Sequence, residues 1–89
     1  MELTIEIPDY TTADGFRYDW CDKSRIATSL HDGVFVLKAN KEGLESLAKQ
    51  LLQLSQNEIP KGYHLHYDEY NCLEDGSVEF IIEKDMIDE

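Results

Sequence analysis

The amino-acid sequence predicts an α+β fold, a mostly antiparallel β-sheet with one helix packed on one face. Short runs of alternating apolar and polar residues predict strands, and two Asp-Gly dipeptides predict hairpin turns between them. A central stretch with a helical period predicts the helix. The expected order is β-β-β-β-α-β-β. With 89 residues, the chain is expected to be one small domain, residues 1–89, because its core can support about one sheet and one helix.

Two strands are expected near the N-terminus. Residues 3–7 alternate apolar and polar side chains until Pro8 stops the run. After a polar stretch, residues 16–20 alternate in the same way, with aromatic side chains at every second position.

The first hairpin is predicted around Asp32-Gly33, the dipeptide that a type I′ turn favours because both central residues need a positive φ. In the resulting register Leu30 lies opposite Phe35. One face of the hairpin then carries four apolar residues that are expected in the core, Ile26, Leu30, Phe35 and Leu37.

The helix is expected to begin after Asn40, a favoured N-cap residue, and to end before Pro60. Gly43 in its first turn weakens it slightly. Its expected core face is an apolar stripe formed by Leu44, Leu47, Ala48, Leu51, Leu52 and Leu54.

The second hairpin is predicted around Asp75-Gly76. If its turn has two residues, one side faces the helix and carries Leu65, Tyr67, Leu73, Val78, Phe80 and Ile82. The other side carries His64, His66, Asp68, Tyr70, Cys72, Glu79, Ile81, Glu83 and Asp85. In this register Asp68 lies opposite Glu83, and two carboxylates about 5 Å apart repel each other.

The overall charge points to the class of partner. Nineteen acidic residues against eight Lys and Arg give a formal net charge of −11. Such a chain is repelled by nucleic acids and anionic lipid and is attracted to basic protein surfaces. The N-terminus has no signal-peptide pattern, and the two cysteines fit a reducing compartment, so a cytoplasmic location is expected.

The outward face of the second hairpin has three interpretations. It is a solvated polar face, or a site where Lys and Arg side chains of a partner protein meet its carboxylates, or a metal site built from His64, His66 and Asp68. Catalysis by Cys72 is not expected, because neighbouring carboxylates raise the pKa of a thiol. No cofactor-binding motif is present in the sequence, and we do not expect an enzyme.

Residues 40–84 resemble the Immunity protein 32 family of bacterial polymorphic toxin systems. The resemblance rests on the NKEGL helix start, the His64-x-His66 strand, Asp68, Asn71, Leu73, Glu74, the Gly76-Ser77 pair and the run from Glu79 to Glu83. It implies a small cytoplasmic protein, encoded beside a toxin, that binds and neutralises that toxin. It implies no catalytic residues.

The sequence therefore predicts an immunity-type protein that binds a cognate toxin through an acidic surface, with nucleases as a candidate toxin class because their active sites attract phosphate charge. The expected partner-binding residues are His64, His66, Asp68, Tyr70, Glu79, Glu83 and Asp85. The alternatives are a small metal-binding protein or enzyme that uses the two histidines and Asp68, and a homodimer built on an exposed sheet edge.

Overall fold

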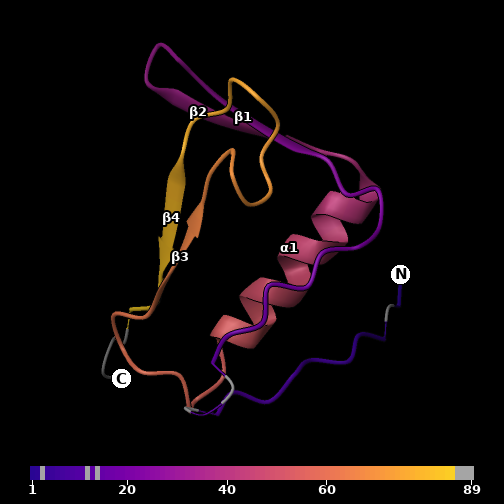
Figure 1. Cartoon of the computed structure of the whole chain (residues 1–89), viewed down its shortest axis with the longest axis vertical. Coiled ribbons are helices and arrows are strands. Elements are labelled where there is room, and N and C mark those ends of the chain that lie inside the picture. The colour runs from indigo at the N-terminus through magenta and orange to yellow at the C-terminus, as the bar shows by residue number, and fades with distance from the viewer. Residues whose placement is uncertain (3, 12, 14, 86–89) are drawn as a thin grey trace.

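The computed structural model describes residues 1–85 except residues 3, 12 and 14. Two antiparallel strand pairs and one helix follow each other as β1 (Ile26–His31), β2 (Val34–Ala39), α1 (Lys41–Leu54), β3 (His64–Tyr67) and β4 (Phe80–Glu83) (Figure 1). The prediction of an α+β fold with antiparallel strands and one helix is confirmed. Within the described residues, no helix combines the length and the apolar character that crossing a membrane requires.

The predicted order of elements is wrong, because the order is β-β-α-β-β and the described residues before β1 form neither of the two expected N-terminal strands. Among the described residues before β1, the only pairing of strand type is an isolated bridge between Thr11 and Gly15. The segment runs alongside helix α1 instead (Figure 1). Residue 3, at the start of the first expected strand, lies outside the described residues.

Glutamine side chains at the helix provide the partner that this segment would otherwise find in a sheet. Gln53 accepts a hydrogen bond from the backbone N–H of Arg17 at 3.1 Å and donates to the carbonyl of Arg17 at 2.9 Å. Gln56 likewise accepts from the N–H of Tyr10 and donates to the carbonyl of Pro8. A side-chain amide offers a donor and an acceptor, as a peptide group does, so these backbone groups are paired without a β-ladder.

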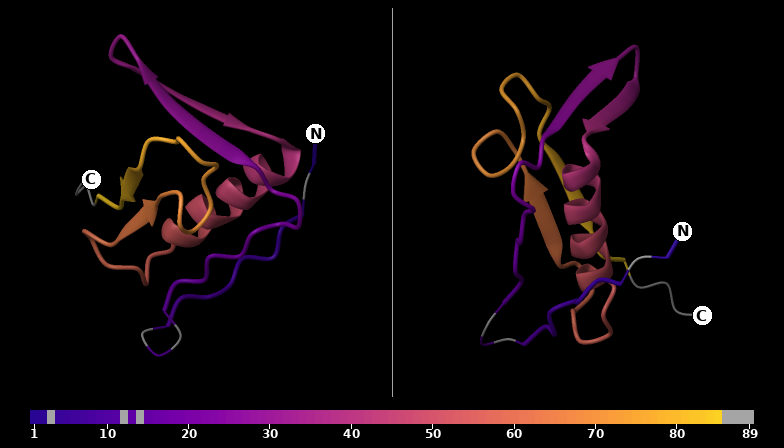
Figure 2. Two further views of the ribbon diagram at one scale, coloured as in Figure 1. Left: turned by 45° about the horizontal axis from the view of Figure 1, so that its top comes forward. Right: turned by 90° about the vertical axis from the view of Figure 1, so that its right-hand side faces the viewer.

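The first hairpin has the predicted register, with Leu30 opposite Phe35. Asp32 and Gly33 both have positive φ, 51° and 80°, as a type I′ turn requires. The predicted core face is confirmed only at the base of the hairpin, where Ile26 is fully buried, whereas Leu30 is 57% and Phe35 44% exposed. The reason is that the distal half of the hairpin extends past the rest of the chain (Figure 2).

Helix α1 begins as predicted, because the side chain of Asn40 accepts a hydrogen bond from the N–H of Gly43 at 2.9 Å. The same oxygen accepts from the N–H of Arg25, which joins the helix start to the residue before β1. A Cβ atom at position 43 would lie 2.8 Å from the carbonyl oxygen of Arg25. Glycine therefore permits a close approach here, which explains why a weak helix former stands in the first turn.

The buried face of the helix differs from the predicted leucine stripe. Leu47 and Leu54 are buried, but Leu44, Leu51 and Leu52 are 54%, 44% and 50% exposed. The buried helix residues are Gly43, Ser46, Leu47, Gln50, Gln53 and Leu54. The helix is turned in this way because its polar side chains form hydrogen bonds with the backbone of the N-terminal segment that packs on it. Part of the leucine stripe is therefore left exposed.

The register of the second strand pair also differs from the prediction. Tyr67 lies opposite Phe80, so a connection of residues 68–79 replaces a tight two-residue hairpin. Asp75-Gly76 does form a turn, in which the N–H of Ser77 donates to the carbonyl of Glu74. Of its central residues only Gly76, at φ 85°, has a positive φ, so it is not the type I′ turn that aligns two strands.

The chain on either side of this turn pairs with β1 rather than with itself. The N–H of Glu74 donates to the carbonyl of Ile26 at 2.9 Å, and the N–H of Val78 donates to the carbonyl of Thr28 at 3.3 Å. These bonds join the two strand pairs around a core formed by Ile26, Leu47, Leu54, Ile59, Leu65, Tyr67 and Leu73.

Candidate functional site

The outward face of β3 and β4 brings together three of the predicted site residues. His64 and His66 project from β3 with their rings 4.9 Å apart, and both are exposed. Glu83 lies opposite His64, and Ile81 lies opposite His66. The predicted pairing of Asp68 with Glu83 is therefore wrong, and no carboxylate pair strains this ladder. A carboxylate opposite an imidazole is instead a favourable cross-strand pair once the imidazole is protonated.

Asp68 leaves the strand face because its carboxylate organises the loop that follows. Its Oδ1 accepts hydrogen bonds from the N–H groups of Tyr70 and Asn71, at 2.9 and 3.1 Å. Asn71 completes the loop, since its side chain accepts from the N–H of Asp68 and donates to the carbonyl of His66. This loop chemistry, and not a two-residue hairpin, sets the position of residues 68–71.

The proposed metal ligands do not converge. The described residues contain no group of three or more His, Cys, Asp or Glu side chains that could hold a metal ion. Nδ1 of His64 lies 3.0 Å from the carbonyl oxygen of Gly62, and the carboxylate of Asp68 is turned to backbone N–H groups. The geometry of the described residues therefore lends no support to the metal interpretation.

Tyr70 is the most exposed aromatic side chain, at 99%. The structure describes every Phe, Tyr and Trp residue, and all of the others have a ring contact. The backbone N–H of Tyr70 is one of the two that donate to the carboxylate of Asp68, and Glu69 accepts a hydrogen bond from the N–H of Gly76 across the loop. An exposed tyrosine on an ordered loop loses little conformational entropy when a partner covers it.

Two basic side chains near this surface are already engaged. Lys84 donates to the carbonyl oxygens of Gln56 and Ile59, so its charge holds the chain after the helix. Arg25 forms a 3.0 Å ion pair with Glu74. Among the described residues no ion pair involves the remaining acidic side chains of residues 68–85, which are Asp68, Glu69, Asp75, Glu79, Glu83 and Asp85.

The surroundings of Cys72 disfavour the thiolate form that a nucleophilic cysteine needs. Burial, and secondly the charge of Asp68, raise the pKa of the Cys72 thiol to about 11, so at neutral pH it carries its proton. The nearby histidines lie on the outward strand face, whereas Cys72 packs against the core.

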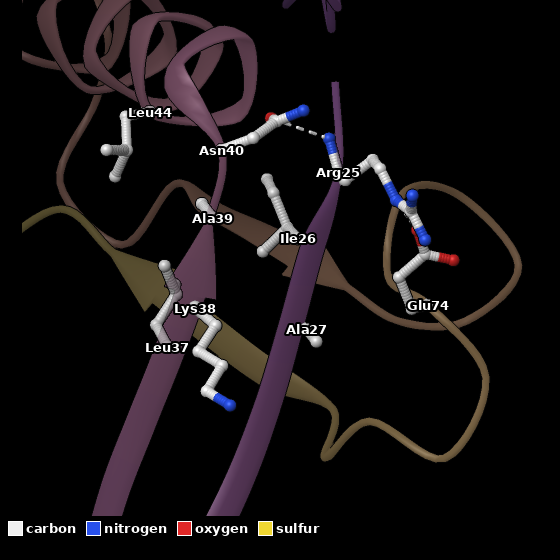
Figure 3. Close-up of a pocket in the computed structure, with 9 residues that line it drawn as sticks. All are labelled: Arg25, Ile26, Ala27, Leu37, Lys38, Ala39, Asn40, Leu44 and Glu74. Atoms are coloured by element: carbon white, nitrogen blue, oxygen red, sulfur yellow. Dashed lines mark hydrogen bonds and ion pairs between the residues drawn. The ribbon is translucent and has the colours of Figure 1, made fainter. Parts of the chain in front are cut away.

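A separate hollow of about 650 Å³ opens beside the start of helix α1 (Figure 3). Its described lining residues include no Ser, Cys or His; they are Arg25, Ile26, Ala27, Leu37, Lys38, Ala39, Asn40, Leu44 and Glu74. None of the predicted site residues lies in it.

Sequence reasoning missed the exposed apolar surface of the first hairpin. Val34, Phe35 and Val36 are 60%, 44% and 37% exposed on the described hairpin. The signal was present, because an uninterrupted apolar run lacks the alternation expected of a strand with one solvated face.

Comparison with known proteins agrees with the resemblance seen in the sequence. The model of the family described as Immunity protein 32 matches residues 34–85, which span β2, α1, β3 and β4. No curated protein and no solved structure matches the chain. The match covers more than half of the 89 residues, and the chain belongs to the Immunity protein 32 family.

Proposed function

Because the chain belongs to the Immunity protein 32 family, we propose that it is a cytoplasmic immunity protein that binds and neutralises a cognate toxin domain. It acts by binding, without catalysis, as one small domain. Its contact region is the acidic hairpin surface, which comprises His64, His66, Asp68, Tyr70, Glu79, Glu83 and Asp85.

The observation that carries this proposal is the negative charge of residues 79–85, which no described ion pair compensates. Lys84 and Arg25 are held by other groups, so the exposed carboxylates of Glu79, Glu83 and Asp85 are available to cations of a partner. Opposite charges on two proteins speed their encounter, and the exposed Tyr70 provides contact area once they meet.

A basic toxin surface is therefore the expected counterpart. A nuclease domain fits this description, because the groups that attract the phosphates of its substrate also attract a carboxylate-rich inhibitor. Occupying such a surface competes directly with nucleic acid, which provides a simple mechanism of neutralisation.

The first test is co-expression with the product of the neighbouring toxin gene. The chain is expected to rescue growth and to co-purify with the toxin. Failure of both refutes the proposal.

The second test reverses charge on the acidic hairpin surface. Glu79→Lys together with Glu83→Lys is expected to slow association at low salt by about tenfold or more. Asp68 is left unchanged because its carboxylate holds the loop. The matched control, Glu2→Lys with Glu6→Lys, changes the net charge equally at two exposed N-terminal positions and is expected to slow association far less. Equal effects of the two variants would show that net charge alone, and not this surface, governs binding.

A further inference from the structure

In the part of the chain that the structure describes, strand β4 is bonded along one edge. It pairs with β3, and the two together form a sheet of two strands. Within the described residues, no other backbone group is bonded to residues 80–83. One row of strand N–H and C=O groups therefore has no partner among the described residues.

The residue after β4 shows which backbone groups form this row. The N–H of Lys84 donates to the carbonyl of Tyr63 at 2.8 Å, and the carbonyl of Lys84 accepts from the N–H of Gly62 at 2.9 Å, so both groups of Lys84 point to the β3 side. Backbone direction alternates along an antiparallel strand. Ile82 therefore points its groups to β3 as well, and Ile81 and Glu83 point theirs to the free edge.

We propose that this free edge of β4 receives a strand of the cognate toxin, bonded to the backbone of Ile81 and Glu83, and that this toxin strand carries basic side chains. The inference rests on the proposed function and specifies how the toxin is held. Strand addition suits such an edge, because backbone hydrogen bonds provide affinity while alternate side chains provide specificity.

Charge decides between a toxin strand and a second copy of this chain. If two copies paired their β4 edges antiparallel about Ile81, Glu83 of each would lie opposite Glu79 of the other, and the carboxylates would repel. Acidic side chains on an edge strand oppose self-association in this way. The same carboxylates, with Asp85 beyond them, attract a strand that carries Lys or Arg.

The different environments on the two faces of β4 predict that basic and apolar side chains alternate along the added strand. On the outward face, its side chains would lie beside Ile81 and Glu83, next to the two histidines, so a basic residue fits there. On the other face they would lie beside Phe80 and Ile82, which are only partly buried, and the ring of Phe35 lies 5.5 Å from that of Phe80. The toxin strand is therefore expected to alternate basic and apolar residues.

Amide hydrogen exchange of the complete chain, with and without the product of the neighbouring toxin gene in an inactivated form, tests the inference. In the free chain, the N–H groups of Ile81 and Glu83 are expected to exchange fast and that of Ile82 slowly, because only Ile82 is bonded to β3. In the complex, exchange at Ile81 and Glu83 is expected to slow at least tenfold.

Each other outcome overturns a different statement. A complex in which Ile81 and Glu83 exchange as fast as in the free chain overturns strand addition and leaves the proposed function standing. Failure of the two proteins to associate overturns the proposed function itself. Protection of these amides in the isolated chain at rising concentration identifies a second copy as the occupant and also overturns the inference.

A substitution provides the matched control. Ile81→Pro removes an N–H that points to the free edge, which an edge strand tolerates, and Ile81→Ala shortens the same side chain but keeps the N–H. The proline variant is expected to bind at least tenfold more weakly than the alanine variant, with an unchanged circular dichroism spectrum. Equal affinities of the two variants contradict a backbone contact.

Discussion

Replacing Tyr67 by Phe removes one hydroxyl group from the centre of the core and tests how the buried polar face of helix α1 is stabilised. Tyr67 and Gln50 are both fully buried, and the hydroxyl donates to Oε1 of Gln50 at 2.9 Å. In Tyr67→Phe, this oxygen remains buried among the described residues without a donor.

The expected loss of stability is larger when one partner of a buried hydrogen bond is removed than when both are, because the remaining polar group is then buried without a partner. A buried acceptor without a partner costs about 1–3 kcal/mol, and Tyr67→Phe is expected to lower the free energy of unfolding by this amount. For a chain of this size, each kcal/mol lowers Tm by about 4–8 °C. Gln50→Leu is expected to cost at least as much, because it leaves the hydroxyl unpaired and also removes the hydrogen bond that the amide donates to the carbonyl of Asp19 at 3.4 Å.

The decisive variant combines Tyr67→Phe with Gln50→Leu. With the hydroxyl and the amide both absent, neither is left without the other, so the double variant is expected to be more stable than the sum of the single changes indicates, by up to about 3 kcal/mol. The carbonyl of Asp19 lacks its Gln50 donor in both variants that carry Gln50→Leu. Urea unfolding followed by circular dichroism measures all three variants against the unaltered chain. Additive effects of the two substitutions would refute the reasoning, because they would show that the hydroxyl and the amide are not coupled.

The same pair predicts a dependence on alkaline pH. Burial raises the pKa of Tyr67 well above its ordinary value of 10.0. Since the unfolded chain releases this proton near pH 10 and the folded chain does not, the stability that this group contributes is complete below pH 10 and is lost as the pH rises further. Tyr67→Phe is expected to reduce this alkaline loss, which unfolding curves between pH 9 and pH 11 measure.

Three further predictions concern the helix and the cysteines. Leu54→Ala is expected to cost about 2–5 kcal/mol, and Leu51→Ala, at a site 44% exposed, less than about 1 kcal/mol; equal costs in urea unfolding would show that the leucine stripe is the core face after all. Asn40→Ala is expected to lower the unfolding free energy by about 1–2 kcal/mol in the same assay, and no change would contradict the role of this cap. Alkylation by iodoacetamide at pH 8 is expected to modify the exposed Cys21 first, with Cys72 reacting readily only as the pH approaches 11; equal rates at pH 8 would contradict the burial of Cys72.

The candidate site could be predicted only in part from the sequence. Alternation along β3 correctly placed His64 and His66 on the outward face, because strand periodicity is local. The opposing residue was wrong, because the Asx turn of Asp68 and a turn at Gly76 that is not type I′ shift β4 relative to β3. A change of register alters every cross-strand neighbour.

The sequence by itself determined the first hairpin and the start of the helix, because both depend on interactions between residues that are close in the chain. Asp32-Gly33 and Asn40 act on residues at most a few positions away, so their effects can be read without knowing the rest of the fold. Membership of the Immunity protein 32 family is also a property of the sequence.

Tertiary structure alone decided which face of the helix is buried and what becomes of the N-terminal segment. Gln53 bonds the backbone of Arg17 across 36 positions, and Tyr67 bonds Gln50 inside the core. Local periodicity could not predict these partners, because a strand-like segment requires only that its backbone groups be paired, and does not specify whether a sheet or a row of glutamines pairs them. The acidic side chains are a second example. Composition shows how many there are, but only the contacts of Lys84 and Arg25 show which carboxylates lack a basic partner among the described residues.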